Sequence, residues 1–192
     1  MKNKLVGFMG APGTGKTTLA FAMKEYAMRK GYSSDVCSEC AREHCYKYGV
    51  PKTPYSQYRI NLEQIDRENI FLKGNNDYIF EDSCLWMGYA FTLVNFRQDQ
   101  GEEARSIIDE IYNRFVIEQM GRYHKVFHLK YGGLAFDDGC RDLDVNKKLA
   151  TVMDGFVLAH QHILPIVTVD IPIDKTEQRK DFIWEHLAGD GA

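Results

Sequence analysis

The stretch Gly10-Ala11-Pro12-Gly13-Thr14-Gly15-Lys16-Thr17 matches the phosphate-binding pattern G-x-x-x-x-G-K-T. The apolar residues 5–9 before it predict a short buried strand. From Lys16 onward, Leu19, Met23 and Ala27 recur at helical spacing and predict an amphipathic helix. Strand, glycine turn and helix therefore occur in the order that this loop requires, and we predict a nucleoside triphosphate site here.

Each residue type in the stretch has a physical role. The glycines let the backbone wrap a polyphosphate with its N–H groups inward, at a helix N-terminus whose dipole favours negative charge. Lys16 would reach the β and γ phosphates, and the Thr17 hydroxyl would hold Mg²⁺. The predicted nucleotide contacts are Gly10, Ala11, Pro12, Gly13, Thr14, Gly15, Lys16, Thr17 and Thr18.

Length and charge narrow the class of protein. A chain of 192 residues with 44% hydrophobic residues is long enough for one substantial core, so we predict a single domain over residues 1–192. Its 24 basic and 27 acidic side chains give a net charge of −3, which excludes a global basic field for nonspecific nucleic-acid binding. A DNA or RNA partner would need a local basic patch.

The N-terminal residues and the cysteines indicate a compartment. Only a few apolar positions precede the glycine loop, too few for a signal segment or a membrane span. The five cysteines are odd in number and are not spaced as a secreted disulfide framework. We expect a cytoplasmic protein with reduced thiols and no membrane partner.

Strand and helix patterns alternate along the chain. Strands are predicted at 5–9, 34–38, 78–80, 126–129 and 166–169, and helices from 16 and at 40–48, 56–73, 85–97, 102–120, 144–162 and 174–187. Gly31 is expected to end the first helix, Pro51 and Pro54 to interrupt the pattern, and Asp174 to cap the last helix. The alternation predicts an α/β fold with three layers and a five-stranded, mainly parallel sheet.

In such sheets ligands bind beyond the carboxyl ends of the strands. After the second strand comes Glu39-Cys40-Ala41-Arg42-Glu43, in which Glu39 could accept the proton of an attacking hydroxyl, with Asp35 as a less favoured substitute. Arg42 could hold an acceptor or its phosphate. The alternative for this segment is a solvated helix N-terminus.

Two further segments follow strands. After the third strand, Asp82 of Glu81-Asp82-Ser83 is predicted to support Mg²⁺ or the acceptor, although such residues also cap helices. Residues 131–143 are rich in glycine and aspartate and are predicted to form a lid that brings Arg141 onto the transferring phosphoryl group. The alternative is a surface turn in which Arg141 pairs with a neighbouring aspartate.

Arg179 and Lys180 in the last helix carry two interpretations. We expect them to form a charged helix face. An approach of Arg179 to the nucleotide from the adenine side is the less favoured interpretation.

Together, these segments resemble the P-loop kinases related to bacterial nicotinamide riboside kinase, which show an E-x-A-R-E-like box, an Asp after the third strand and a D-G-x-R-like lid. The chain also resembles bacteriophage deoxynucleotide kinases and kinases of hydroxymethyluracil in DNA. It departs from the group at Ser83, because an arginine is common after the Asp. The resemblance implies a P-loop kinase fold and phosphotransferase chemistry.

A zinc site is a competing interpretation. Cys37-x-x-Cys40-x-x-x-His44-Cys45 has the ligand types of a tetrahedral site, with Cys40 and His44 on one helix face. A single C-x-x-C without a second pair is weak evidence, however, and Cys37 falls in a predicted strand. Buried thiols in an α/β core are the favoured interpretation.

The sequence therefore predicts an ATP- and Mg²⁺-dependent kinase in which Lys16, Glu39, Asp82 and Arg141 carry the chemistry. The expected acceptor is a nucleoside or nucleotide, bound by Asp35, Glu39, Arg42 and Asp82. A modified pyrimidine within DNA is the second expectation, because residues 46–73 interleave tyrosines with lysines and arginines. Acidic residues in the same interval favour a solvated helix instead.

A protein of another class also fits these patterns. A P-loop ATPase that acts as a switch or motor subunit would need no phosphoryl acceptor. The oligomeric state is not predicted from the sequence.

Overall fold

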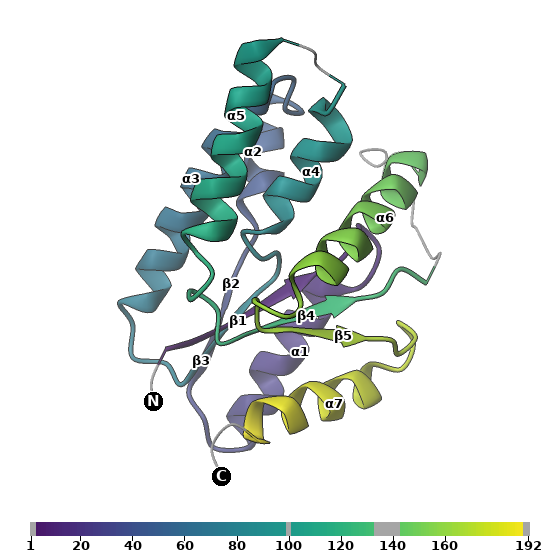
Figure 1. The fold of residues 1–192 in the computed structure, drawn as a ribbon. Helices are drawn as coiled ribbons and strands as arrows, with labels where there is room; N and C mark the ends of the chain where they lie inside the picture. Colours follow the sequence, from purple (N-terminus) through teal and green to yellow (C-terminus); the bar gives the residue numbers. More distant parts are fainter. Residues whose placement is uncertain (1–2, 99–100, 133–142, 190–192) are drawn as a thin grey trace.

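A computed structural model describes residues 3–98, 101–132 and 143–189. Its centre is one five-stranded sheet with the strand order β2-β3-β1-β4-β5, and all four neighbouring pairs are parallel (Figure 1). The strands are β1 (Lys4–Met9), β2 (Ser34–Cys37), β3 (Tyr78–Glu81), β4 (Lys125–Leu129) and β5 (Ile166–Val169). The predicted α/β fold is therefore confirmed, and β1 lies at the centre of the sheet.

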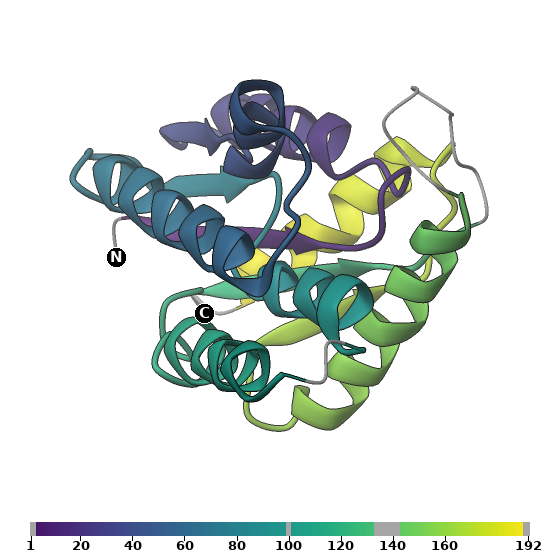
Figure 2. The ribbon, with the colours of Figure 1, turned by 90° about the horizontal axis from the view of Figure 1, so that it is seen from above.

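Helices cover both faces of this sheet, which makes the three layers visible in Figures 1 and 2. On one face lie α1 and α7, and on the other lie α3, α4, α5 and α6. The helices are α1 (Lys16–Arg29), α2 (Cys40–Tyr48), α3 (Pro54–Leu72), α4 (Met87–Phe96), α5 (Glu102–Tyr112), the π-helix η1 (Asn113–Ile117), α6 (Leu143–His160) and α7 (Thr176–Ala188).

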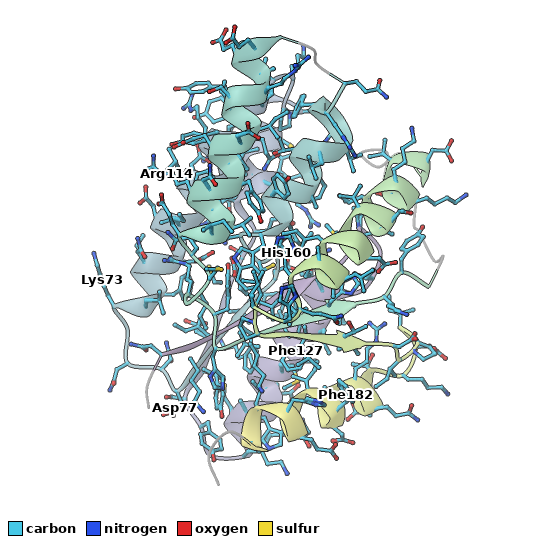
Figure 3. All side chains as sticks on the ribbon, viewed as in Figure 1. Lys73, Asp77, Arg114, Phe127, His160 and Phe182 are labelled. Atoms are coloured by element: carbon cyan, nitrogen blue, oxygen red, sulfur yellow. The ribbon has the colours of Figure 1, made fainter. Side chains whose placement is uncertain are left out.

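Strand alternation divides the core into two parts. In β1, Val6 and Phe8 face α1 and α7, whereas Leu5 and Met9 face α4, η1 and α6. Both sets are buried, as a parallel sheet covered by helices requires. On the α7 side, Phe127 of β4 lies near His186, with 6.4 Å between the ring centroids, and the structure places Phe182 on the same helix (Figure 3).

The predicted start of α3 was wrong. The helix begins at Pro54, where the missing N–H costs nothing because the first turn has no intrahelical acceptor for it. Thr53 is the N-cap, and its hydroxyl accepts a hydrogen bond from the Ser56 N–H at 3.2 Å. Pro54 therefore starts the helix that it was expected to precede as a breaker.

Two other helix predictions were also corrected. The helix expected over 102–120 changes to π geometry at Asn113, where the Glu118 N–H donates to the Asn113 carbonyl at 2.9 Å. Asp174 does not cap α7, which begins at Thr176 after a turn closed by Lys175 N–H and the Pro172 carbonyl. By contrast, α1 ends as predicted, with Gly31 in the left-handed conformation.

Within the described ranges, none of the helices combines the length and the apolar character needed to span a bilayer.

Candidate active site

The glycine loop joins the carboxyl end of β1 to the first turn of α1. Gly13 and Gly15 have φ values of 86° and 84°, in the left-handed region that side chains rarely adopt. At Gly10 the limit is space, since a Cβ there would lie 2.8 Å from the Leu129 carbonyl oxygen. Glycine at these positions therefore follows from the path of the loop itself.

Lys16 lies over this loop. Its Nζ donates to the Gly10 carbonyl at 2.8 Å and to the Ala11 carbonyl at 3.3 Å. Thr14 tightens the same turn, because its hydroxyl donates to the Ala11 carbonyl at 2.9 Å. The ammonium group is thus held against carbonyl oxygens of the loop, and a phosphate oxygen would be a stronger acceptor for it than a neutral carbonyl.

Thr17 and Asp82 meet beside the loop. The Thr17 hydroxyl lies 2.9 Å from Oδ1 and 2.8 Å from Oδ2 of Asp82. This contact exists because β3 pairs directly with β1, so the residue after β3 lies next to the first turn of α1. A hydroxyl and a carboxylate are oxygen ligands that suit Mg²⁺, so the donor set fits the predicted metal.

Arg179 lies under the loop and is not part of a charged surface. It is 3% exposed, and its Nη1 donates to the Thr14 carbonyl while its Nε donates to the Ile171 carbonyl, both at 2.8 Å. Burial lowers the pKa of this guanidinium. The expected charged helix face was therefore wrong for Arg179, because α7 packs this residue inward against the loop.

A small pocket of about 50 Å³ opens beside Arg179. It is lined by Gly15, Thr18, Leu19, Ile173, Thr176 and Arg179. These residues come from the loop, from α1 and from the residues at and just before the start of α7, so two segments far apart in the sequence line the pocket.

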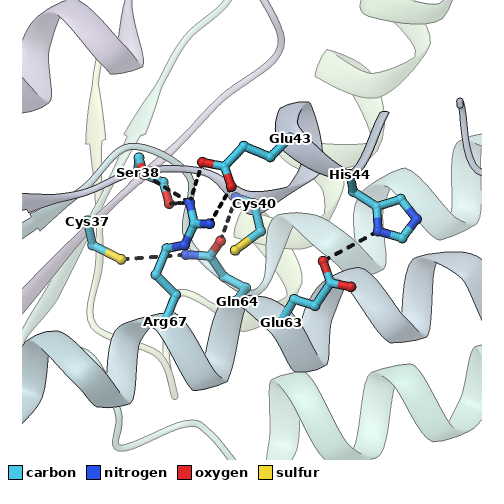
Figure 4. A network of polar contacts seen from close by, with 8 residues as sticks. All are labelled: Cys37, Ser38, Cys40, Glu43, His44, Glu63, Gln64 and Arg67. Atoms are coloured by element: carbon cyan, nitrogen blue, oxygen red, sulfur yellow. Dashed lines mark hydrogen bonds and ion pairs between the residues drawn. The ribbon is translucent and has the colours of Figure 1, made fainter. Parts of the chain in front are cut away.

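On the other side of the loop, α2 begins at the carboxyl end of β2. Glu39 is the half-buried N-cap residue of α2, and Arg42 is exposed. The helix is fixed from α3: Arg67 makes a two-pronged ion pair with Glu43 at 3.0 and 2.6 Å, and the Gln64 Oε1 accepts from the Cys40 N–H at 3.0 Å (Figure 4). Glu43 thus has a positioning role for the helix.

Asp35 is not brought to this edge. In the register of the sheet it is opposite Ile79, which in turn is opposite Leu5 near the start of β1. Lys24 of α1 donates to Asp35 at 2.8 Å. Partial burial opposes ionisation, but the hydrogen bond from Lys24 lowers the pKa of Asp35. The structure thus pairs this predicted acceptor residue with α1, away from the glycine loop.

A buried polar network lies behind Asp82. Because strand residues alternate, Glu81 points to the opposite face of the sheet from Phe80, toward α3. There the Gln64 Nε2 donates to the Glu81 Oε1 at 2.6 Å. Burial, and next the nearby Glu68 carboxylate, raise the pKa of Glu81 well above its ordinary value.

Glu68 is the charged centre of this network. Arg122 pairs with it through Nε, and the Tyr123 hydroxyl donates to it at 3.1 Å. The same hydroxyl accepts from the Leu85 N–H at 2.7 Å, in the segment that follows Asp82. Helix α3 is therefore connected by hydrogen bonds to the segments on both sides of Asp82.

A polar stripe along α3 continues this network. Gln57 donates to Asn61 at 3.2 Å, and Asn61 lies so close to α4 that a Cβ on Gly88 would be 2.1 Å from its Oδ1. Among the described residues, the Asn61 Nδ2 and the Trp86 Nε1 are buried without a hydrogen-bond partner. Unpaired buried donors of this kind mark a place where a ligand can supply acceptors.

The match to a family model covers most of the chain. Residues 5–179 match the model described as AAA domain. The chain belongs to the AAA domain family. No curated protein matches it significantly by sequence.

Solved structures share the fold of this AAA domain. Deoxyadenosine kinase from M. mycoides with bound dATP has a TM-score of 0.68 and 17% sequence identity, covering 96% of this chain and 98% of that chain. The structure of the same kinase with bound dCTP has a TM-score of 0.66 and 16% sequence identity, covering 96% of this chain and 99% of that chain. The structure with the products dCMP and dCDP bound has a TM-score of 0.62 and 16% sequence identity, covering 96% of this chain and 98% of that chain. These likenesses identify an α/β P-loop kinase fold.

The cysteines of this AAA domain do not form a ligand cluster where the structure describes them. Cys37 and Cys40 are buried, and the Gln64 Nε2 donates to the Cys37 Sγ at 3.9 Å. Burial raises the pKa of the Cys40 thiol to about 11. His44 instead faces Glu63, at 3.4 Å. The described ranges contain no group of three His, Cys, Asp or Glu residues placed to hold a metal.

Of the predicted lid over 131–143, the structure describes only residues 131, 132 and 143. Arg141 lies outside the described residues. Of the other predicted residues, the structure brings Lys16, Thr17 and Asp82 together. It places Glu39 and Arg42 at the start of α2.

The buried network was missed by sequence reasoning, although a signal for it existed. Polar residues recur at helical spacing on the buried face of α3, namely Gln57, Asn61, Gln64 and Glu68. A polar stripe at the positions where a core face is expected indicates a hydrogen-bonded network or a site.

Proposed function

We propose that this AAA domain is an ATP-dependent kinase that transfers the γ-phosphate to a nucleoside or nucleotide. The observation that carries the proposal is the convergence of Lys16, Thr17 and Asp82 at the edge of the sheet where α2 begins. The P-loop kinase fold supports it. A second supporting observation is the polar stripe of α3, which offers buried hydrogen-bond donors on the acceptor side.

The donor half of the reaction would be bound by the glycine loop. Backbone N–H groups and the Lys16 ammonium would hold the β and γ phosphates, and the adenine would lie near the pocket beside Arg179. Thr17 and Asp82 would hold Mg²⁺, which when bound neutralises charge on the phosphate oxygens. Arg179 would keep the loop in shape through its bond to the Thr14 carbonyl.

The acceptor half would be served by α2 and by the lid. Glu39 would take the proton of the acceptor hydroxyl. At the same time, the oxygen of that hydroxyl would form a bond to the γ-phosphorus. The bond between that phosphorus and the bridging oxygen breaks, and ADP leaves with the electron pair. Arg42 would orient the acceptor, and Arg141 would neutralise charge on the transferring group. Replacing Arg141 with Ala should lower kcat more than it raises KM.

For the acceptor itself, we propose a deoxyribonucleoside or its nucleotide. The similar deoxyadenosine kinase structures contain dATP, dCTP or dCMP with dCDP. In this chain, Asn61 and Gln57 could pair with the edge of a base, since an amide both donates and accepts. A hydroxymethylated pyrimidine within DNA is the second candidate acceptor, favoured by the exposed aromatic and basic residues at the end of α2 and after it.

Incubation with labelled ATP, Mg²⁺ and a panel of nucleosides, nucleotides and single-stranded DNA tests the proposal. A labelled acceptor is the expected product. Release of labelled phosphate alone would overturn the kinase assignment and favour an ATPase of the switch or motor class. The Asp82→Asn variant serves as the negative control, because it removes the carboxylate beside Thr17.

A further inference from the structure

The segment between α2 and the first turns of α3 differs in charge from the rest of the chain. From His44 to Leu62 there is no Asp or Glu, although the whole chain has a net charge of −3. The same interval contains Lys47, Lys52 and Arg59, and all three side chains are exposed. This interval therefore carries a local excess of positive charge, which a nucleic-acid partner requires.

The tyrosines of this segment are unusually exposed. Tyr46 is 77% exposed, Tyr48 68% and Tyr55 58%. A single exposed aromatic residue is ordinary on a protein surface, but three of them interleaved with three cations form a pattern of their own. Aromatic rings beside lysines and arginines are how proteins bind single-stranded nucleic acids, by stacking bases and neutralising phosphates.

Two of these rings are held in place. Tyr55 stacks on Tyr58 with 6.3 Å between centroids and 6° between planes. Arg114 of η1 lies 5.6 Å from the Tyr58 ring and donates to its hydroxyl at 2.5 Å. The Tyr48 ring contacts the His44 ring, with 4.9 Å between centroids. Pre-ordered rings lose less conformational entropy when a base stacks on them.

Acidic residues close in sequence offset this positive charge only in part. Glu43 is paired with Arg67 and Glu68 is buried with Arg122, whereas Glu63 is half-buried and lies 3.4 Å from the His44 ring. The exposed Asp66 lies further along α3, two turns beyond Arg59. Two of the acids that favoured a merely solvated helix in the sequence are thus paired with arginines, and the other two, Glu63 and Asp66, follow Arg59 along α3.

The basic interval begins in the helix that starts at the candidate active site. Helix α2 starts at Cys40, directly after Glu39, and Arg42 and Tyr46 are four residues apart on one of its faces. A polymer bound along α2 would lead from the tyrosines to the position of the proposed base.

We propose that Tyr46, Lys47, Tyr48, Lys52, Tyr55 and Arg59 form a binding surface for single-stranded nucleic acid, here called the tyrosine–lysine surface. The inference rests on the proposed function in one respect: if the protein is a kinase, the strand bound at this surface would carry the phosphoryl acceptor. The binding itself requires no phosphoryl transfer.

Fluorescence anisotropy of a labelled oligothymidine, titrated with the protein at several salt concentrations, tests the surface. We expect affinity to fall as salt rises. The slope of the logarithm of the binding constant against the logarithm of the salt concentration changes by roughly 0.7 for each phosphate contact to a single strand. The triple variant Lys47→Gln/Lys52→Gln/Arg59→Gln removes three cations, so it should reduce the magnitude of this slope by about 2. The variants Tyr46→Ala and Tyr55→Ala should each weaken binding roughly 5-fold or more at fixed salt.

Two matched controls lie outside the surface. Lys73→Gln removes an exposed cation at the far end of α3 (Figure 3), and Phe21→Ala removes a ring on α1 that is 56% exposed. Both should leave binding within 2-fold, about 0.4 kcal/mol by RT ln 2. Absence of oligothymidine binding, or equal losses in the controls, would overturn the inference.

Further arms separate the outcomes. An oligouridine arm distinguishes RNA from DNA as the strand. Sedimentation that shows self-association lost in Tyr46→Ala, without nucleic-acid binding, would assign the surface to a second copy of the chain and overturn the inference. If free nucleosides are phosphorylated but no strand binds, only this inference fails. If strands bind but no acceptor is labelled, only the proposed kinase fails.

Discussion

The proposed donor and acceptor sides of the site are built in different ways. The proposed donor side is one contiguous stretch, Gly10 to Thr17, whose backbone would do most of the binding, and Asp82 and Arg179 contact this stretch. The acceptor side comes from α2, α3 and the residues after β3, joined by side-chain hydrogen bonds. A backbone site can be recognised as a motif, whereas a side-chain site is defined only when distant segments pack together.

Replacing Lys16 should give the largest effect. This variant removes the charge that is proposed to bind the β and γ phosphates, so we expect Lys16→Ala to lower kcat at least ~10³-fold, about 4 kcal/mol, with the fold intact. Transfer of labelled phosphate to the acceptor would measure kcat, and a thermal melt would show whether the fold is intact. Lys30→Ala, an exposed lysine that follows the same helix, is the control. Near-normal turnover in Lys16→Ala would contradict the assignment of the glycine loop as the ATP-binding side of the site.

Breaking the acceptor-side network should mainly affect stability. Arg122→Met leaves the buried Glu68 carboxylate without its cation, which should cost about 3 kcal/mol of the free energy of unfolding. Urea unfolding would measure it. The double variant Arg122→Met/Glu68→Gln should recover most of the loss. No recovery would mean that packing of the Arg122 stem, not charge pairing, holds this region.

Arg179 tests whether the donor side depends on tertiary contacts. Arg179→Met removes the donors to the Thr14 and Ile171 carbonyls, and we expect a loss of about 2 kcal/mol in stability together with a raised KM for ATP. Lys180→Met, on the same helix and paired with Glu177, should cost about 0.5 kcal/mol or less. Equal effects in the two variants would contradict a special role for Arg179.

Per pH unit, the smallest expected effect is a pH dependence from Glu81. Its pKa is raised in the fold, so its contribution to stability is present below the ordinary value of about 4.3 and is lost as pH rises from there through the folded pKa. Glu81→Gln should remove this decline, which is at most about 1.4 kcal/mol per pH unit. Unfolding curves between pH 4 and 8 would show it. An identical pH slope in the variant would mean that Glu81 does not hold a proton.

Sequence reasoning located all five strands. Four of them are short, mostly apolar runs bounded by turn residues or charges, whereas β2 (Ser34–Cys37) contains Ser34 and Asp35 and was placed by its position after Gly31. It failed where local residues have more than one use. Pro54 breaks a helix from inside but also starts one, and only the Thr53 cap decides between these uses. The change at Asn113 to π geometry left no signal that we could recognise in the sequence.

For the candidate site, the same division holds. The glycine loop and Asp82 were predicted because each follows a strand directly. Arg179 was assigned to a charged surface because its spacing on α7 does not tell which face packs inward. Asp35 was proposed for the acceptor because its place in the register of β2 was not known.

By itself, the sequence determined the phosphate-binding loop, the alternation of strands and helices and the parallel sheet, since glycine geometry and hydrophobic periodicity act over a few residues. Only the tertiary structure decided that β3 lies beside β1 and so brings Asp82 to Thr17. It also decided that Arg179 supports the loop and that Glu68, Glu81 and Arg122 share one buried network. These relations join residues far apart in the chain, and their geometry depends on strand order and helix packing, which no local pattern specifies.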